Sequence, residues 1–124
     1  MNEVKTAEEI KRRVMPFLEK GFNFEYFYEK GGDSSCVYIC RLKKGRDFFD
    51  WREVSGAEEI HLVVKADGLF AFPNLKNRHK KIARAFFWKH ILKKATMDEK
   101  RDLFAQMLLQ ELALSPKNFF GIEL

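Results

Sequence analysis

No stretch of this 124-residue chain is apolar for the roughly 18–20 residues that a membrane-spanning helix requires, and no signal-peptide pattern opens it. Cysteine is scarce, with only Cys36 and Cys40 present. If both lie on one strand they are roughly 13 Å apart, whereas a disulfide needs Cα atoms within about 7 Å. We therefore expect two reduced thiols in a cytoplasmic protein that has no membrane segment.

The sequence also lacks the short motifs that mark common catalytic and cofactor-binding sites. It contains no glycine-rich phosphate loop, no H-E-x-x-H motif and no paired C-x-x-C motifs. His79 and His90 are about 16 Å apart along a helix, which is too far for them to share a metal ion. We therefore expect a non-catalytic protein with no cofactor and no metal site. An enzyme whose site is assembled from residues distant in the sequence remains an alternative.

The grouping that comes closest to a catalytic site is acidic and surrounds Trp51. On a strand, Asp47 and Glu53 share one face and Asp50 points to the other. The three carboxylates then do not converge on one metal ion. We interpret them as solvated strand carboxylates, with a metal-dependent nuclease that also uses His61 as the alternative.

The rest of the composition is that of a folded chain. Hydrophobic residues make up 46% of it and aromatic residues 15%. A chain of this length buries close to two thirds of the surface of its unfolded state, and domains commonly contain roughly 100–150 residues. We expect a single domain, residues 1–124, with a core rich in aromatic side chains.

Helical signals come first along the chain. Thr6 and Glu9 fit a capping box in which Thr6 is the N-cap and Glu9 reaches back to it. Pro16 should kink or shorten this helix, and Gly21 is placed for a left-handed C-terminal cap. Apolar residues recur between these points at helical spacing, namely Ile10, Val14, Phe17 and Leu18.

The period of the apolar residues then changes from 3.6 to 2, which indicates half-buried strands. We expect strands over residues 22–29, 36–42, 46–54, 60–64 and 69–72. Turn residues separate them at 31–34, 43–45, 55–57 and 67–68. Connections this short join antiparallel neighbours, so the sequence predicts an antiparallel meander of four to five strands.

After Pro73 the pattern is helical again. Asn74 is a suitable N-cap for a helix over residues 75–95. Thr96 and Glu99 repeat the capping box and open a last helix to about Leu114. We therefore predict two C-terminal helices.

The chain ends in an apolar tail that we expect to dock on the body, because it carries Phe119, Phe120 and Ile122. Helices and strands are segregated along the sequence, which is typical of an α+β fold. We predict an N-terminal helix, the antiparallel meander, and two C-terminal helices packed on one face of the sheet.

Acidic residues are missing from one long segment, residues 68–97, which carries eight basic residues and a net charge of +8. Residues 1–67 carry 12 basic and 13 acidic residues, and residues 98–124 carry three and five. The whole positive excess of the chain, +5, therefore comes from the segment that contains the helix expected at 75–95.

On a helix at 100° per residue, the basic residues of this segment divide between two faces. The face that we expect to be exposed carries Arg78, His79, Lys89, His90 and Lys93, together with Ile82 and Phe86. The face that we expect in the core carries Ala83, Phe87, Trp88, Ile91, Leu92 and Ala95. Lys80, Lys81 and Arg84 intrude on that second face near its start.

The leading hypothesis is that the exposed basic face binds nucleic acid or another polyanion. Arg78, Lys89 and Lys93, with His79 and His90 among them, would supply charge, and Phe86 would stack or anchor. An alternative is a protein-interaction or homodimer surface that docks an acidic partner through the same helix. The third interpretation is a solvated face, balanced by carboxylates such as Glu8, Glu9, Glu58 and Glu59.

Overall fold

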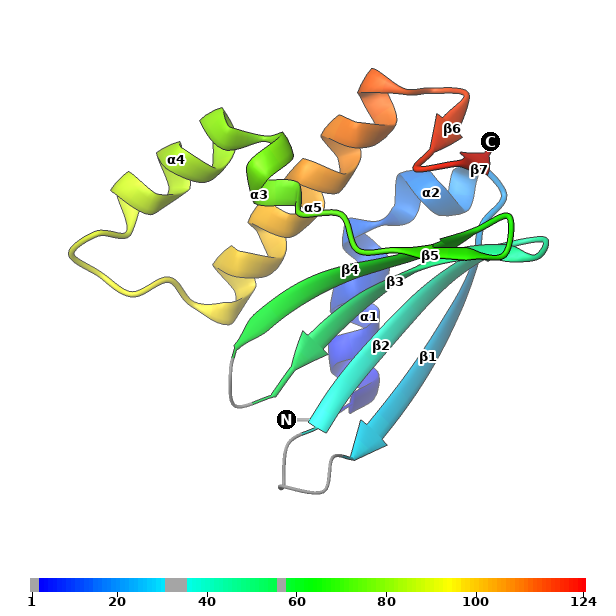
Figure 1. Ribbon diagram of the computed structural model, residues 1–124. Coiled ribbons are helices and arrows are strands. Elements are labelled where there is room, and N and C mark those ends of the chain that lie inside the picture. Colours follow the sequence, from blue (N-terminus) through cyan, green and yellow to red (C-terminus); the bar gives the residue numbers. More distant parts are fainter. Residues whose placement is uncertain (1–2, 31–35, 56–57) are drawn as a thin grey trace.

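The computed structural model describes residues 3–30, 36–55 and 58–124 and confirms the predicted α+β class (Figure 1). Its main sheet has five antiparallel strands whose order in space follows the chain. The strands are β1 (Asn23–Lys30), β2 (Cys36–Lys44), β3 (Asp47–Val54), β4 (Glu59–Ala66) and β5 (Leu69–Ala71). The turn expected at 31–34 and residues 56–57 of the next turn lie outside the described residues.

Two hairpin turns of the main sheet lie wholly within the described residues. Asp67 and Gly68 both have positive φ, 52° and 78°, as a two-residue hairpin turn requires. The turn between β2 and β3 is shorter than we predicted, because β2 continues to Lys44 and only residues 45–46 form the turn. The predicted meander is otherwise confirmed.

The N-terminal helical region begins earlier than its sequence signals indicate. Helix α1 spans Glu3–Arg13, so Thr6 is a buried residue inside the helix and the prediction that it is the N-cap was wrong. The predicted effect of Pro16 is confirmed, since the helix is interrupted at Val14 and Pro16 lies in the first turn of α2 (Met15–Glu19). Gly21 follows α2 with φ of 98°, as expected.

The C-terminal region agrees with its capping signals. Helix α5 (Met97–Leu114) opens with the full capping box of Thr96 and Glu99. Strands β6 (Asn118–Phe119) and β7 (Ile122–Glu123) form a small hairpin. Phe119 and Ile122 are buried, which confirms that the tail docks on the body.

Helices α1 and α5 cover one face of the sheet, and the core lies between these layers (Figure 1). Alternate strand residues face the helices, and Trp51 packs edge-on against Phe104 of α5 with 4.7 Å between ring centroids. Phe17 packs against Phe49 in the same way. Along the described residues, no helix is long and apolar enough to cross a bilayer.

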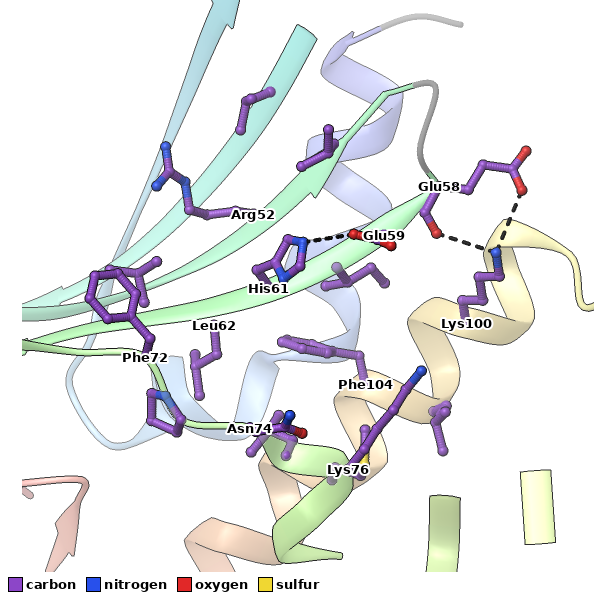
Figure 2. A pocket seen from close by; sticks show the side chains of 18 of the residues that line it. Arg52, Glu58, Glu59, His61, Leu62, Phe72, Asn74, Lys76, Lys100 and Phe104 are labelled. Carbon is purple, nitrogen blue, oxygen red and sulfur yellow. Dashed lines mark hydrogen bonds and ion pairs between the residues drawn. The ribbon is translucent and has the colours of Figure 1, made fainter. Parts of the chain in front are cut away.

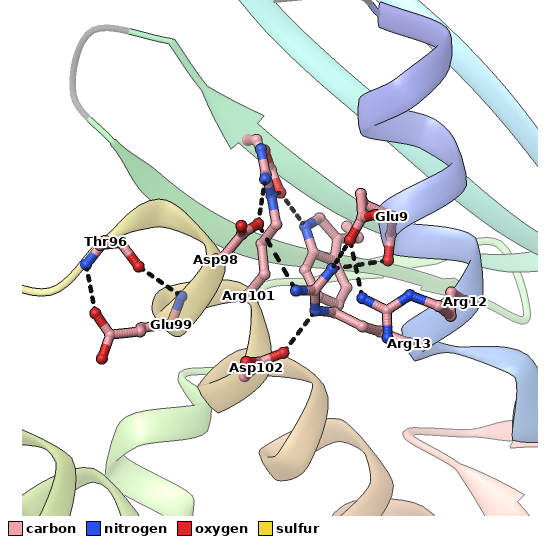
Figure 3. A network of polar contacts seen from close by, with 10 residues as sticks. Glu9, Arg12, Arg13, Thr96, Asp98, Glu99, Arg101 and Asp102 are labelled. Atoms are coloured by element: carbon pink, nitrogen blue, oxygen red, sulfur yellow. Dashed lines mark hydrogen bonds and ion pairs between the residues drawn. The ribbon is translucent and has the colours of Figure 1, made fainter.

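A polar network, buried around Glu53 and exposed at Asp102, ties the two helices to the sheet (Figure 3). Arg101 donates two hydrogen bonds to Glu53 over 2.8 and 2.9 Å, and the indole of Trp51 donates a third over 3.0 Å. The bond to Glu53 raises the pKa of Arg101. Arg13 of α1 donates to Asp102 of α5 over 2.8 Å. Charged side chains therefore join α1, α5 and β3.

Two of the three strand carboxylates that we interpreted as solvated are in fact buried. Glu53 faces the helices, and Asp50 points to the opposite face, as the strand alternation predicts. Asp50 accepts two hydrogen bonds from Arg41, over 2.8 and 3.0 Å, and the guanidinium of Arg41 lies over the ring of Phe48. Each buried carboxylate therefore forms an ion pair with a different arginine. The alternation of residues along a strand does not reveal these partners.

The two cysteines form no disulfide with each other, as their spacing predicts. The Sγ of Cys36 lies 2.8 Å from the Tyr28 hydroxyl. Cys40 is buried in the core, and this burial strongly raises the pKa of its thiol. The structure therefore makes Cys40 an inert core residue.

Candidate functional site

The basic segment forms an arm that projects from α5 away from the sheet (Figure 1). The single helix predicted over residues 75–95 is wrong, because the segment is broken into α3 (Leu75–Arg78) and α4 (Lys80–Lys89). His79 separates them with φ of −125° and ψ of 56°, and residues 91–96 are not helical. Asn74 caps α3 as predicted. We refer to residues 75–95 as the arm.

The base of the arm is fastened to α5 by one buried carboxylate, Glu111. His79 Nε2 lies 2.9 Å from Glu111 Oε1, and the guanidinium of Arg78 bonds to both carboxylate oxygens. This contact raises the pKa of Arg78. His79 is buried, not exposed as we expected. Arg78 and His79 therefore hold the arm in place.

The inner face of α4 packs against the body. Ile82 and Phe86 are half-buried and contact the core cluster. The ring of His90 lies on Phe86 with 4.4 Å between centroids, and its Nε2 lies 3.3 Å from Glu99 of α5. Phe86 and His90 therefore face α5 rather than solvent, which corrects their assignment to the exposed face.

The outer face of α4 carries the residues that we assigned to the core. Phe87 and Trp88 are 60% and 62% exposed, so this assignment was wrong. At 100° per residue, one arc of about 120° holds both rings and three exposed cations. We call this set the outer face of α4, and it consists of Lys80, Lys81, Arg84, Phe87 and Trp88.

The cations of the outer face have no carboxylate partners. Lys80, Lys81 and Arg84 form no ion pair with any carboxylate of the described residues, and the same holds for Lys89 and Lys93, which are also exposed. The first four lie along α4, Lys93 follows it in the non-helical segment, and none has an acidic neighbour in sequence. Their charge is therefore available to a negatively charged ligand.

Of the four carboxylates that we considered as a balance for the arm, two are engaged elsewhere, and Glu8 forms no ion pair with a described residue of the arm. Glu9 bonds to Arg12 and Arg13 of its own helix, and Glu59 contacts His61. Glu58 is the exception, because Lys94 lies 3.4 Å from it and this contact lowers its pKa. The interpretation as a balanced, solvated face therefore applies to Lys94 and not to the outer face of α4.

The end of the arm is apolar and exposed. Ile91 and Leu92 follow α4 in the non-helical segment, and Leu92 is 98% exposed. Contacts within the chain do not explain a fully solvated leucine beside two solvated aromatic rings. This tip extends the candidate surface beyond the helix.

One signal in the sequence counted against the predicted orientation of the arm. Lys80, Lys81 and Arg84 fell on the face that the apolar residues assigned to the core, and a core face tolerates cations poorly. Ile82 and Phe86 form a shorter stripe, but on the helix expected over residues 75–95 that stripe also carries Lys89 and Lys93. Both faces therefore carry cations, and the sequence alone did not decide between them.

Within residues 3–30, 36–55 and 58–124, no group of three or more His, Cys, Asp or Glu side chains could hold a metal ion. No protein-family model, curated protein or solved structure matches this chain.

Proposed function

We propose that this protein is a small, non-catalytic cytoplasmic module that binds single-stranded nucleic acid through the outer face of α4. One observation carries the proposal: three cations that pair with no carboxylate of the described residues share one arc of a single helix with two exposed aromatic rings. Cations attract the phosphate backbone, and aromatic rings stack on bases.

Single strands suit this surface better than duplexes do. Phe87 and Trp88 project from a convex helix and offer ring faces to bases that are already unstacked. The ten residues of α4 extend about 15 Å, so a bound strand would pass over Lys80, Lys81 and Arg84 within a few nucleotides. Lys89 and Lys93 would continue the positive track toward the tip.

The residues that would bind differ from those that the sequence suggested. Lys89 and Lys93 stay in the binding set. Arg78 and His79 would act indirectly, by holding α3 on Glu111, and His90 would position α4 against α5. The stacking role moves from Phe86 to its neighbour Phe87 and to Trp88.

The exposed tip favours a second candidate function, which is docking of an acidic partner protein or of a second copy through the arm. Ile91 and Leu92 offer aliphatic surface that nucleic acid does not need. A protein interface uses such groups as central anchors with a charged rim. Oligonucleotide binding and sedimentation of a Leu92→Asp variant distinguish the two functions.

Trp88 provides a built-in reporter for the test. The chain has two tryptophans, and Trp51 is fully buried whereas Trp88 is exposed. We expect a 15-nucleotide oligo(dT) to quench Trp88 fluorescence at about 50 mM salt and to bind much more weakly at about 200 mM. Trp88→Phe should abolish the fluorescence change, while the anisotropy of a labelled oligonucleotide still reports binding.

Two charge-reversal variants, one in α4 and one elsewhere, test which cations bind the oligonucleotide. Replacing Lys80, Lys81 and Arg84 by Glu should weaken oligo(dT) binding by more than tenfold. It should also reduce the slope of the logarithm of the binding constant against the logarithm of the salt concentration by about two, at about 0.7 per phosphate contact. The matched control replaces three exposed lysines elsewhere, Lys5, Lys43 and Lys117, by Glu, which changes the net charge equally. The control should keep most of the affinity.

Three results would overturn the proposal. They are no binding at about 50 mM salt, binding that is indifferent to salt, and equal losses in the two charge-reversal variants. Quenching of Trp88 by anionic lipid vesicles but not by oligo(dT) would assign the face to a membrane surface instead. Sedimentation that shows a dimer disrupted by Leu92→Asp would support the second candidate.

A further inference from the structure

A cleft of about 890 Å³ lies between the edge of the sheet at β4 and the helices beside it (Figure 2). Leu103, Phe104 and Met107 of α5 give it an apolar floor. Phe86 of α4 and residues 72–75 also line it. The cleft is distinct from the outer face of α4, because Phe86 lies on the opposite side of that helix.

The side of the cleft formed by β4 is an open sheet edge. Strand β5 pairs with residues 64–66 of β4 and then leaves toward α3. Among the described residues, no strand pairs with residues 59–63 on that side. Five residues of β4 therefore border the cleft with one edge uncovered, a length of about 16 Å.

The hairpin between β4 and β5 determines which backbone groups point into the cleft. Ala66 and Leu69 flank the two-residue turn and form its closing hydrogen-bonded pair. Backbone groups of alternate residues point to opposite edges of a strand, so the N–H and C=O of Ile60 and Leu62 point to the same edge as those of Ala66. The N–H and C=O groups of Ile60 and Leu62, four in all, therefore face the cleft and pair with no described strand.

We propose that this cleft binds an extended peptide segment of a partner protein as an additional strand along residues 59–63 of β4. Only an extended backbone offers donors and acceptors in the alternation that Ile60 and Leu62 present. The apolar floor would receive the peptide side chains that lie opposite these two residues, because directly paired residues point to the same face of a sheet.

The charges around the cleft select the other side chains of the peptide. His61 is paired with Arg52 in the register, and both face away from α5. The Nε of Arg52 is buried and has no hydrogen-bond partner among the described residues. The Nη2 of Arg52 lies 3.9 Å from a carboxylate oxygen of Glu29, which is a long contact for an ion pair. Glu59 already contacts His61. A peptide with an acidic residue opposite His61 would complement this row, so the preferred pattern is apolar–acidic–apolar.

A second copy of this chain complements the cleft less well than an acidic peptide does. Antiparallel pairing of two β4 edges around His61 would bond Ile60 of one copy to Leu62 of the other and would place the two His61 side chains opposite each other. A peptide with an acidic residue at that position supplies a carboxylate that His61 of a second copy does not.

Amide hydrogen exchange tests the proposal at the two residues concerned. In the free protein, the Ile60 and Leu62 amides should exchange fast, while those of His61 and Val63, which face β3, exchange slowly. The probe is a pool of seven-residue peptides with Val or Leu at odd positions and Asp or Glu at even positions. We expect a binding peptide to slow exchange at Ile60 and Leu62 by at least about tenfold, with His61 unchanged.

Two modifications separate strand addition from general attraction. Methylating the peptide nitrogens that face β4 should weaken binding by about tenfold or more, because each lost hydrogen bond leaves a carbonyl without its partner. Arg52→Gln should weaken binding of the acidic peptides several-fold, whereas Lys43→Gln, at an exposed site on β2, should not. Replacing Lys80, Lys81 and Arg84 by Glu should leave peptide binding intact, so the two proposals fail independently.

The outcomes decide the proposal directly. Absence of binding by the whole pool at about 1 mM protein, or binding that leaves Ile60 and Leu62 unprotected, overturns it. Slow exchange at both amides in the free protein also overturns it, since the edge would then be covered. Protection that rises with protein concentration in the absence of peptide would identify a second copy as the occupant.

Discussion

The body and the arm use the same charged residues in opposite ways. In the body, Arg101 and Glu53 are both buried, and their side chains satisfy each other between α5 and the sheet. In the arm, Lys80 and Arg84 are exposed and form no ion pair with a described carboxylate. Charged side chains that pair with an opposite charge therefore stabilise the fold, whereas the cations of the arm that pair with no described carboxylate are free to contact a ligand.

Burial explains why charged side chains in the body need partners of opposite charge and those in the arm do not. A buried ion without a partner loses its hydration and gains little in return, so Glu53 requires Arg101 and the Trp51 indole. A solvated lysine keeps its hydration and tolerates the absence of a partner. The arm can therefore accumulate eight cations at little cost to folding, provided that its base is held to α5.

The largest effect should come from breaking the matched pair in the body. Arg101→Met leaves Glu53 buried with a charge and only the Trp51 donor, and we expect a loss of about 3–5 kcal/mol in the free energy of unfolding. Urea denaturation followed by circular dichroism measures it. Arg12→Met, which removes an exposed pair with Glu9, is the control and should cost less than about 1 kcal/mol. Equal costs would contradict the comparison.

Loosening the junction between body and arm should have an intermediate effect. Glu111→Gln weakens the contacts to Arg78 and His79, and we expect a loss of about 1–3 kcal/mol, because the carboxylate is buried while Arg78 is half-exposed. Amide exchange at residues 79–83 should quicken more than exchange in the sheet. Glu123→Gln, at an exposed carboxylate, serves as the control. Unchanged exchange in the arm would show that Glu111 does not hold it.

A smaller effect is expected at the cap that begins α5. Thr96→Ala removes the hydroxyl that accepts from the Glu99 amide, which should cost about 1 kcal/mol. Hydrogen bonds from Thr96 lower the pKa of Glu99, and in the variant this pKa should rise partway, since the backbone N–H remains. NMR titration of the Glu99 side chain measures the shift, and an unchanged pKa would contradict the capping-box interpretation.

The lowered pKa of Glu99 also predicts the pH dependence of the cap. Because the carboxyl binds its proton more weakly when folded, its stabilising contribution is present above the pKa of the unfolded chain. The contribution is lost as the pH falls through the lower pKa of the folded state. The stability difference between wild type and Thr96→Ala should therefore shrink on acidification through this range.

The smallest effect on stability should come from the arm itself. Trp88→Ala and Arg84→Gln should each change the free energy of unfolding by less than about 0.5 kcal/mol, because both side chains are exposed and make no contact with the core cluster. The buried counterpart, Trp51→Ala, should cost about 3–5 kcal/mol. A large loss on replacing Trp88 would mean that the outer face is packed, which would remove the basis of the proposed binding surface.

Local signals in the sequence predicted most of the fold. The Asp67-Gly68 turn, the Thr96 capping box and Pro16 each act on neighbouring residues, so their consequences could be worked out without tertiary contacts. Thr6 misled because the chain before it is also helical in the structure. A cap motif does not act as a cap when the helix continues through it.

The candidate site was harder to predict, because its orientation depends on contacts across the chain. The region of α4 carries two apolar stripes, one with Ile82 and Phe86 and one with Phe87 and Trp88, and either is able to face the core. Glu111, more than thirty residues away, bonds to Arg78 and His79 and so sets how the arm leaves α5. No pattern within residues 75–95 contains that information.

By itself, the sequence determined the α+β class, the antiparallel meander and the concentration of positive charge in residues 68–97, because each depends on neighbouring residues or on composition. Only the tertiary structure decided that Phe87 and Trp88 face solvent and that the edge of β4 stays open. The orientation of α4 follows from long-range packing against α5, where Glu111 and the core cluster hold the side that carries Ile82 and Phe86. The open edge follows from the early departure of β5 toward α3.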